Sequence, residues 1–281
     1  MKILVTGKDG MVGWELARAL PALGEVVALG RGELDIADPV AVIATVRKVR
    51  PDVIVNAAAY TAVDKAESDR ENAFLVNAAG PGFLAAEAKA LGALLVHYST
   101  DYVFDGTKQT PYVETDPTNP LSVYGQSKLA GEQAIQASGC RHVILRTSWV
   151  YASRGKNFLL TMLRLAKERP ELRVVDDQRG APTWARDIAE VTRAVLRRPE
   201  APSGIYHCTA AGETTWCGFA REIVRLAGLA TPVVPITTAE YPTPARRPAN
   251  SRMSAGALLV AYDVALPAWD LSLGRCIEGH L

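Results

Sequence analysis

Short apolar runs alternate with longer segments of helical spacing along the first 150 residues of the chain. The apolar runs show no period-two alternation, which is typical of strands that are buried on both faces of a sheet. One of the longer segments begins at Asp38, a residue that caps helices well, with Pro39 at the first helical position. The pattern predicts strands at residues 2–5, 25–29, 52–59, 93–100 and 142–151, and helices at residues 11–23, 38–49, 69–91 and 121–132.

Strands that alternate with helices in this way predict an α/β fold with a doubly wound parallel sheet, whose ligands bind at the carboxyl ends of the strands. The alternation becomes looser after about residue 150. We therefore expect a sheet domain over residues 1–150, to which later segments could return, and a smaller α/β lobe over residues 151–281. In this second part the pattern predicts helices at residues 157–168, 185–198 and 214–228, and short strands at residues 172–177 and 204–210.

The composition is that of an ordinary globular protein, with 281 residues of which 48% are apolar and 22% charged. A net charge of +1 provides no broad basic surface, so we expect no nucleic-acid partner. The apolar runs are no longer than strands and the N-terminus runs straight into glycine, which predicts neither a membrane span nor a signal peptide. The four cysteines form no CxxC motif, which indicates reduced thiols in a cytoplasmic protein.

A glycine-rich turn, VTGKDGMVG, directly follows the first predicted strand and opens the first helix. Its glycines are spaced GxxGxxG rather than GxGxxG, but they serve the same physics. They permit a tight turn and let backbone N–H groups approach a pyrophosphate. We expect the dinucleotide to contact Gly7, Gly10, Met11, Val12 and Gly13; the alternative is an ordinary turn between a strand and a helix.

The second predicted strand ends at Gly30 and Arg31, where NAD-binding sites often place a carboxylate that holds the ribose 2′-hydroxyl. An arginine can instead hold a 2′-phosphate through two parallel hydrogen bonds. The sequence therefore favours NADPH as cofactor, with NADH possible as well. Asp35 lies four residues after Arg31, and we expect it to lie near the adenine together with Ile36.

Tyr124 and Lys128 lie four residues apart in a predicted helix and therefore on one of its faces. They are either an acid–base pair or two exposed side chains. These two residues, the glycine turn, NAAA at 56–59 and YSTDYVF at 98–104 resemble the extended short-chain dehydrogenase/reductase family. Within it, the chain resembles the dTDP-4-dehydrorhamnose reductases over about residues 2–270, in the strings NAAAYTAVDKAESD, HYSTDYVFDG, LAGEQA, RTSWVYA, DQRGAPT and PTPARRPANSR.

The resemblance implies a Rossmann domain with a small substrate-binding lobe. It also implies a reaction, the reduction by NAD(P)H of the C4 carbonyl of dTDP-6-deoxy-L-lyxo-4-hexulose to give dTDP-L-rhamnose. Hydride addition leaves an alkoxide that needs a proton, and a tyrosine can supply it as general acid. Lowering the pKa of a tyrosine from about 10 to about 7 requires about 4 kcal/mol in favour of the phenolate, which a nearby ammonium can provide.

By the same resemblance Tyr124 is the proton donor, Lys128 tunes it and holds the nicotinamide ribose, and Thr100 bonds the substrate carbonyl. The other expected contacts are Asp101 and Trp149 to the sugar, Ala59, Tyr60 and Thr61 to the nicotinamide side of the cofactor, and at least one of Arg246, Arg247 and Arg252, for which we take Arg247, to the diphosphate. Asn77 lies in the middle of a predicted helix, with a backbone contact near the site or a structural role equally open. His97 lies on a predicted buried strand, where core packing is the expected role.

Some relatives of this kind are described as dimers that share Mg²⁺, and Glu15 matches one position of that site. Arg186 falls at another position and would repel a cation, so we predict no metal site, with Glu15 as the only possible Mg²⁺ contact. The chain is expected to be a monomer or a homodimer. Two alternatives stay open: a reductase or epimerase for another nucleotide sugar, and a non-catalytic NADP-binding subunit like the regulatory subunit of methionine adenosyltransferase.

Overall fold

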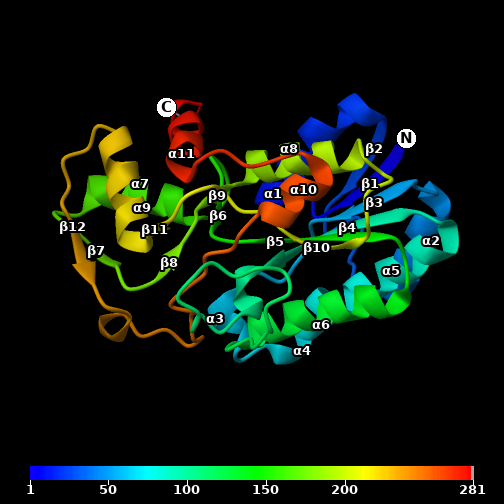
Figure 1. The fold of residues 1–281 in the computed structure, drawn as a ribbon, viewed down its shortest axis with the longest axis horizontal. Coiled ribbons are helices and arrows are strands. Elements are labelled where there is room, and N and C mark those ends of the chain that lie inside the picture. Colours follow the sequence, from blue (N-terminus) through cyan, green and yellow to red (C-terminus); the bar gives the residue numbers. More distant parts are fainter. Residues whose placement is uncertain (280–281) are drawn as a thin grey trace.

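A six-stranded parallel sheet forms the centre of the computed structural model, which describes residues 1–279 (Figure 1). The strand order is β10-β5-β4-β3-β1-β2, and every neighbouring pair is parallel. The predicted doubly wound fold is confirmed. The strands are β1 (Lys2–Thr6), β2 (Glu25–Leu29), β3 (Val53–Asn56), β4 (Leu94–Thr100), β5 (His142–Thr147) and β10 (Gly204–His207).

Helices cover both faces of this sheet. Figure 1 shows α1 (Met11–Ala19) and α8 (Ala185–Leu196) above it, and α5 (Gly80–Leu91) and α6 (Val123–Ser138) below it. Leu16 of α1 and Ile188 of α8 share one apolar core with strand residues such as Val5, while Leu84 and Ile135 share the other with Leu4. Alternate residues of each strand therefore point into different cores, as the unbroken apolar runs predicted. Helix α2 (Pro39–Val49) belongs to the lower layer, and Asp38 caps it by accepting from the N–H groups of Val40 and Ala41.

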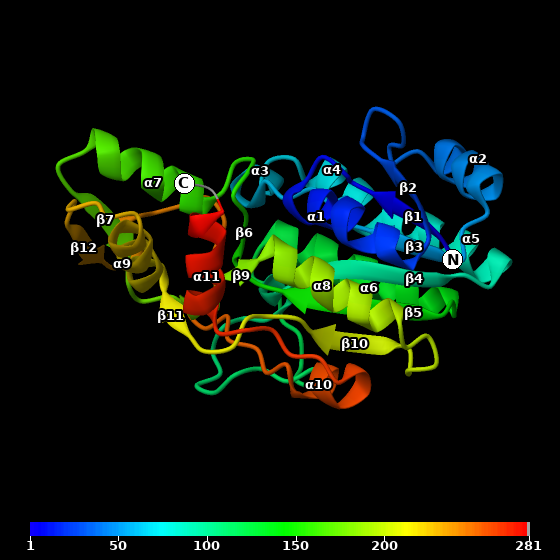
Figure 2. The ribbon, with the colours of Figure 1, turned by 90° about the horizontal axis from the view of Figure 1, so that it is seen from above.

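The smaller lobe lies beside the carboxyl ends of the strands (Figure 2). Its core is built by α7 (Phe158–Glu168), β7 (Leu172–Val175), α9 (Trp216–Leu226), β12 (Val233–Ile236) and α11 (Trp269–Glu278). Between the elements of the lobe, the chain returns to the sheet domain three times. Helix α8 packs against α1, and β10 extends the sheet beside β5. Helix α10 (Gly256–Tyr262) packs through Leu258 and Tyr262 in the core that α1 and α8 share. Two short strand pairs, β6 (Val150–Tyr151) with β9 (Thr183–Trp184) and β8 (Arg179–Gly180) with β11 (Thr214–Thr215), connect the two parts. Among residues 1–279, no helix is both long and apolar enough to cross a membrane.

Several elements differ in extent from the sequence pattern. The strand expected at 142–151 ends at Thr147, because the backbone turns at Trp149, whose φ is 48°. The strand expected at 52–59 ends at Asn56. The helix expected at 69–91 is α4 (Arg70–Phe74), a π-helical turn η2 (Leu75–Ala79) and α5, so its irregular turn lies before the Gly-Pro-Gly segment. The remaining short elements are α3 (Val63–Ala66) and the 3₁₀ turns η1 (Leu20–Leu23), η3 (Asp101–Val103) and η4 (Thr238–Glu240).

A buried ion pair joins α6 to the sheet. The guanidinium of Arg146 on β5 donates to both carboxylate oxygens of Glu132, at 2.9 and 2.6 Å, and both side chains are almost fully buried. The same guanidinium lies over the ring of Phe104, 5.1 Å from its centroid. Such a pair contributes little compared with an apolar pair of the same volume, but removing one partner leaves a buried charge.

We therefore expect Glu132→Gln to lower the free energy of unfolding by about 3–5 kcal/mol, measured by urea denaturation. The matched control is Glu168→Gln, which breaks the exposed pair that Arg164 and Glu168 form at 2.6 Å. Exposed pairs of this kind contribute about 0.3–0.5 kcal/mol. Equal losses in the two variants would contradict a special role for the buried pair.

Candidate active site

The glycine turn lies where the strand order of the sheet reverses, since β1 has β2 on one side and β3 on the other. Gly7 has φ of +72°, and a Cβ there would lie 2.6 Å from the backbone nitrogen of Ala58. A Cβ on Gly13 would lie 2.0 Å from the carbonyl oxygen of Gly7. Helix α1 starts directly after Gly10, and no side chain caps its N-terminus. Glycines thus keep open a cradle that fits a dinucleotide pyrophosphate, at the switch point where such ligands bind.

Charged side chains of both signs surround the end of β2. Arg31 is 82% exposed, and its Nε lies 3.3 Å from a carboxylate oxygen of Asp35. Sequence reasoning missed Glu33, which accepts from the Gly30 N–H at 2.8 Å and pairs with Lys8 at 2.5 Å. A glutamate four residues after the strand end was the available signal, because a short turn can return its carboxylate to the backbone.

The adenine-side residues lie close together but differ in exposure. Asp35 accepts from the N–H of Ala37 at 3.0 Å. Ile36 is 2% exposed and its side chain packs in the lower core, against Gly80. Since its side chain is buried, only the backbone of Ile36 is available to a ligand.

Tyr124 and Lys128 both lie on the side of α6 that faces β4. Ser122 caps the helix by accepting from the N–H of Gly125, which places Tyr124 in the first turn. The Tyr124 ring meets Tyr102 edge-on at 5.5 Å. The amine of Lys128, 2% exposed, donates to the Tyr98 carbonyl at 2.6 Å.

Thr100 ends β4 and caps the short turn η3. Its hydroxyl accepts from the N–H of Tyr102 and donates to Asp101 at 3.0 Å. It also contacts the Tyr124 hydroxyl. The structure therefore brings Thr100, Tyr124 and Lys128 together at the carboxyl edge of the sheet.

Burial controls the ionisation of these groups. It raises the pKa of Tyr124 to about 12, although the neighbouring Thr100 hydroxyl acts in the opposite direction. It lowers the pKa of Lys128 to about 8, against the attraction of Glu132. The expected fall in the pKa of Tyr124 toward 7 is thus absent from this arrangement, because the Lys128 amine points at the Tyr98 carbonyl and His97.

Asp101 is almost fully buried beside Thr100. Burial raises the pKa of its carboxyl to about 6, while hydrogen bonds from Ser251 and Thr100 oppose the shift. Ser251 comes from the loop that follows the arginines near the C-terminus, a contact that the sequence pattern did not suggest. The carboxyl is thus poised to act as donor or acceptor near neutral pH.

Trp149 stands at the break between β5 and β6, in the left-handed region of backbone space. Its indole stacks on Trp216 of the lobe at 3.8 Å between ring centroids. The absence of a side chain at Gly180 makes this possible, since a Cβ there would lie 2.5 Å from the indole. A residue with strained backbone at a strand end, whose indole packs against two distant segments, is typical of a functional position. Trp216 and Gly180 were not among the predicted site residues.

A cavity of about 840 Å³ lies in the lobe, between α7, β7 and the segment after β12. Phe158, Trp216 and Arg247 contribute to its wall. Arg247 also reaches the sheet domain, because its guanidinium donates to both carboxylate oxygens of Asp64 at 3.2 and 3.0 Å. Arg252 is bound instead to Glu213 at 2.7 Å. The structure thus distinguishes Arg247 from Arg252 by its place at the cavity.

Asn77, in the π-helical turn η2, joins the loop after β3 to α6. Its amide accepts from the Tyr60 N–H at 2.8 Å and donates to the Tyr60 carbonyl and to the Ser127 hydroxyl, both at 3.0 Å. Ser127 lies between Tyr124 and Lys128 in α6. The position of Ala59, Tyr60 and Thr61 is thereby coupled to that of the tyrosine and lysine.

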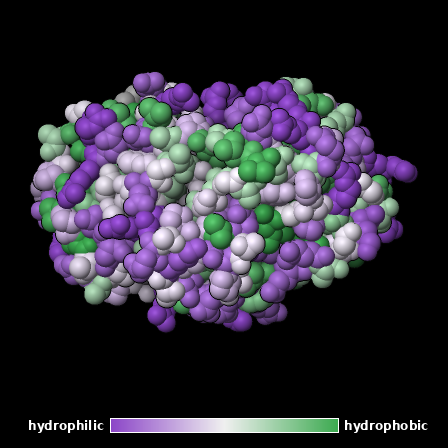
Figure 3. Space-filling view, in the orientation of Figure 1, coloured by the Kyte–Doolittle hydropathy of each residue, from purple (hydrophilic) through white to green (hydrophobic). Residues whose placement is uncertain are grey.

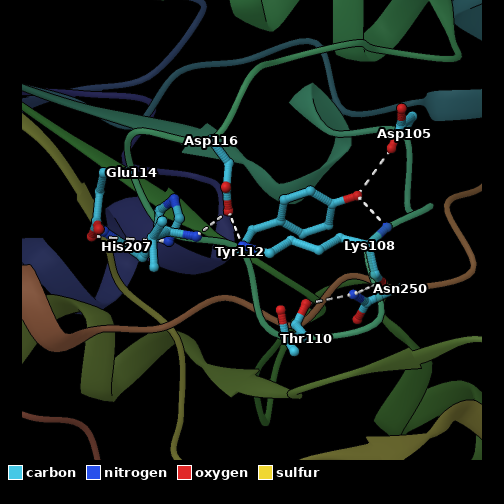
Figure 4. A network of polar contacts seen from close by, with 9 residues as sticks. Asp105, Lys108, Thr110, Tyr112, Glu114, Asp116, His207 and Asn250 are labelled. Carbon is cyan, nitrogen blue, oxygen red and sulfur yellow. Dashed lines mark hydrogen bonds and ion pairs between the residues drawn. The ribbon is translucent and has the colours of Figure 1, made fainter.

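The long loop between η3 and α6 is fixed by a polar network (Figure 4). Asp105 accepts from Thr107, Tyr112 and Asn119, and the Thr107 contacts hold its pKa near 2. The Asn250 amide donates to the carbonyls of Lys108 and Thr110, at 2.7 and 3.0 Å. The network ties the loop that follows Asp101 and η3 to the segment that carries Arg247.

Glu15 is buried on α1 among Arg18, Arg154 and Arg186. Burial raises the pKa of its carboxyl, and the three arginines oppose this shift. In residues 1–279 there is no group of three or more His, Cys, Asp or Glu side chains that could hold a metal ion. Three cations around one carboxylate do not suit Mg²⁺, which prefers oxygen ligands.

A family model and curated relatives identify the family of this chain. A family model described as the RmlD substrate binding domain matches residues 1–281. A dTDP-4-dehydrorhamnose reductase of Burkholderia thailandensis is 54% identical over 296 residues, which cover 100% of this chain and 99% of the relative. The chain belongs to the dTDP-4-dehydrorhamnose reductase family.

Solved structures extend this result to the fold. A dTDP-4-dehydrorhamnose reductase of Clostridium acetobutylicum superimposes with a TM-score of 0.95 at 41% identity, over 99% of both chains. The enzyme of Bacillus anthracis, solved in complex with NADP, has a TM-score of 0.96 at 35% identity, also over 99% of both chains. The family resemblance inferred from the sequence motifs is therefore confirmed, and the family is one of nucleotide-sugar oxidoreductases.

A substitution in the glycine cradle tests whether it binds the cofactor. Gly13→Ala forces its new methyl against the Gly7 carbonyl, and overpacking of this kind costs about 1–3 kcal/mol. We expect NADPH to bind about ten- to hundredfold more weakly, measured by quenching of tryptophan fluorescence. Gly274→Ala in α11 is the control, because a Cβ there meets nothing within 4 Å. Unchanged NADPH affinity in Gly13→Ala would contradict the assignment of the cradle.

Proposed function

We propose that this protein reduces the C4 carbonyl of dTDP-4-dehydro-L-rhamnose (dTDP-6-deoxy-L-lyxo-4-hexulose) to give dTDP-L-rhamnose, with NADPH as the reductant. The observation that carries the proposal is the meeting of Thr100, Tyr124 and Lys128 at the carboxyl edge of the sheet, beside the glycine cradle. The identity of 54% to a named reductase over the whole chain supports the substrate.

In this mechanism the nicotinamide supplies the hydride that reduces the carbonyl carbon. The Thr100 hydroxyl donates a hydrogen bond to the carbonyl oxygen and orients it toward Tyr124. Tyr124 gives its proton to the oxygen as negative charge develops there. Lys128 stabilises the phenolate that remains and holds the nicotinamide ribose. Gly7, Gly10, Met11, Val12 and Gly13 would hold the pyrophosphate, and Ala59, Tyr60 and Thr61 the nicotinamide end.

The lobe would bind the rest of the substrate. Its cavity of about 840 Å³ falls within the range of small-molecule sites. Arg247 on the cavity wall is the group we propose for the diphosphate, since guanidinium groups pair well with phosphate oxygens. Trp149, which stacks on the cavity residue Trp216, and Asp101, which lies beside Thr100, are the proposed sugar contacts.

NADPH is the proposed cofactor on the basis of charge at the end of β2. Arg31 and Lys8 provide two cations there, and the solved relative from Bacillus anthracis was crystallised with NADP. Glu33 and Asp35 lie in the same place and could accept from a ribose 2′-hydroxyl, so some use of NADH is part of the proposal. The four cysteines are buried free thiols, which fits the reducing environment of the cytoplasm.

Two other functions use the same fold. A reductase or epimerase for another nucleotide sugar would share Tyr124 and Lys128, and would differ in the lobe that lines the cavity. A non-catalytic NADP-binding subunit would not need Thr100, Tyr124 and Lys128 gathered at one edge of the sheet. Their arrangement therefore favours an enzyme over a regulatory subunit.

Tyr124→Phe tests the proton donor directly. We expect the rate of NADPH oxidation with dTDP-4-dehydro-L-rhamnose to fall by about 10²- to 10⁴-fold, the contribution of a positioned general acid. The rate is measured by the loss of reduced-nicotinamide absorbance. Tyr206→Phe is the control, because that hydroxyl donates only to the Pro202 carbonyl on the far edge of the sheet.

Two outcomes would overturn parts of this proposal. Rapid turnover by Tyr124→Phe would remove Tyr124 as the acid. A wild-type protein that binds NADPH but does not turn over this sugar would exclude the rhamnose substrate and leave another sugar or a regulatory role.

Arg31→Ala tests the cofactor preference. Loss of a charged hydrogen bond to the 2′-phosphate, about 1.5–3 kcal/mol, should raise the KM for NADPH about ten- to hundredfold. The KM for NADH should change little, because NADH has no phosphate at that position. Arg164→Ala, which removes an exposed arginine on α7, serves as the control. An unchanged ratio of the two KM values would show that Arg31 does not read the 2′-phosphate.

A further inference from the structure

A row of polar side chains crosses the lower face of the sheet where β1 and β3 end. Thr6, Asn56 and His97 are register partners on β1, β3 and β4. The row before it on the same face is Leu4, Ile54 and Leu95, all fully buried in one apolar core. All three polar side chains are at most 1% exposed, although such groups are rarely buried without a reason.

Hydrogen bonds connect this row to Lys128. The Thr6 hydroxyl donates to the Asn56 amide oxygen at 2.6 Å. The Asn56 amide nitrogen lies 3.0 Å from Nδ1 of His97, and Nε2 of the same ring lies 3.2 Å from the Lys128 amine. Four segments, β1, β3, β4 and α6, therefore share one buried chain of contacts.

A backbone group fixes where the protons in this chain lie. The N–H of Ala58, which can only donate, lies 3.2 Å from Asn56 Oδ1, so the oxygen and not the amide nitrogen must face it. The amide nitrogen then donates to Nδ1 of His97, and Nδ1 must be unprotonated. A neutral ring carries its hydrogen on Nε2, the nitrogen that faces Lys128.

The hydrogen on Nε2 of His97 disfavours the ammonium form of Lys128. An ammonium group at Lys128 would bring a donor against the Nε2–H of His97, whereas an uncharged amine would accept from it. The Lys128 amine can still donate to the Tyr98 carbonyl in either form. We propose that His97 is a positioning residue of the reaction, which, held by Asn56 in its Nε2–H tautomer, makes Lys128 give up its third proton more easily.

This row of hydrogen bonds changes the pKa of Lys128 and does not conduct protons to solvent. It ends at the Thr6 hydroxyl and the Ala58 N–H, and a backbone amide does not release its proton. All its side chains are buried. The role of His97 rests on the proposed function only because Lys128 is a catalytic residue in that proposal.

The other groups around the Lys128 amine also affect its pKa. On α6 itself, Glu132 favours the ammonium, but Glu132 is already paired with Arg146 of β5. From β4 only His97 and the Tyr98 carbonyl reach the amine. His97 itself stays neutral, because burial and the nearby Lys128 both lower its pKa.

The tautomer is measured by nitrogen–proton correlation NMR of the full-length protein labelled with ¹⁵N-histidine. The chain has four histidines, and the resonances of His97 are identified by their loss in His97→Gln. We expect the Nε2–H tautomer with no titration between about pH 6 and 9, far above the lowered pKa of a buried imidazole. An Nδ1–H ring or an imidazolium in this range would overturn the proposal. Because the measurement needs no turnover, it separates failure of this inference from failure of the proposed function.

The effect on Lys128 is tested by the pH profile of kcat/KM, which should fall at high pH as Lys128 loses its charge. His97→Asn keeps an amide at the position of Nδ1 but does not reach Lys128, and water can fill the gap. The basic limb should then move up by about one pH unit, the scale of one buried hydrogen bond. His97→Gln places an amide N–H at the position of Nε2 and should restore the limb to that of the wild type.

A purely structural role for His97 predicts a different result. Both variants would then lose activity or stability with the basic limb unmoved, and that outcome overturns the proposal. His207→Asn is the control: His207 is equally buried, but lies two strands away from β4 in the sheet. We expect its basic limb to coincide with that of the wild type.

Discussion

The burial of the Lys128 amine against the carboxyl end of β4 is the interaction on which the rest of the site depends. An amine that is 2% exposed loses its hydration and must find partners within the protein. Its partners here, the Tyr98 carbonyl and His97, belong to one strand. Satisfying the amine therefore fixes how α6 lies across the sheet, and with it the place of Tyr124 beside Thr100.

Small residues allow the close approach that this contact requires. A Cβ on Gly125 would lie 2.2 Å from the Tyr102 carbonyl oxygen, and one on Gly131 would lie 2.1 Å from that of Asn77. Both glycines lie on α6, one near each end of the Tyr124–Lys128 segment. The helix can thus reach η3 on one side and η2 on the other, which brings the loops after β3 and β4 into the same site.

The features that could be predicted from the sequence are those that depend on the local spacing of residues. The parallel sheet follows from the alternation of elements, the open glycine turn from glycine spacing, and the common helix face of Tyr124 and Lys128 from helical spacing. Contacts between distant segments were not predictable in this way. Arg247 pairs with Asp64 across 183 residues, and the return of α8 and β10 to the sheet depends on which faces their apolar residues fit. The stack of Trp149 on Trp216 needs a left-handed backbone at Trp149 and an open space at Gly180, and neither requirement has a sequence signal of its own.

In the proposed proton transfer, the charge of Lys128 is more important than the pKa of Tyr124 before the reaction. Burial favours the neutral form of Tyr124, Asp101 and Lys128 alike, with pKa values of about 12, 6 and 8. A pKa of about 12 does not hinder Tyr124 as an acid, since it keeps the proton in place at neutral pH until an alkoxide of higher proton affinity forms. In the proposed mechanism the difficult step is the formation of a phenolate in a buried site, and a nearby cation stabilises that phenolate. The charge on Lys128, and therefore the neighbour that sets it, controls whether that step is accessible.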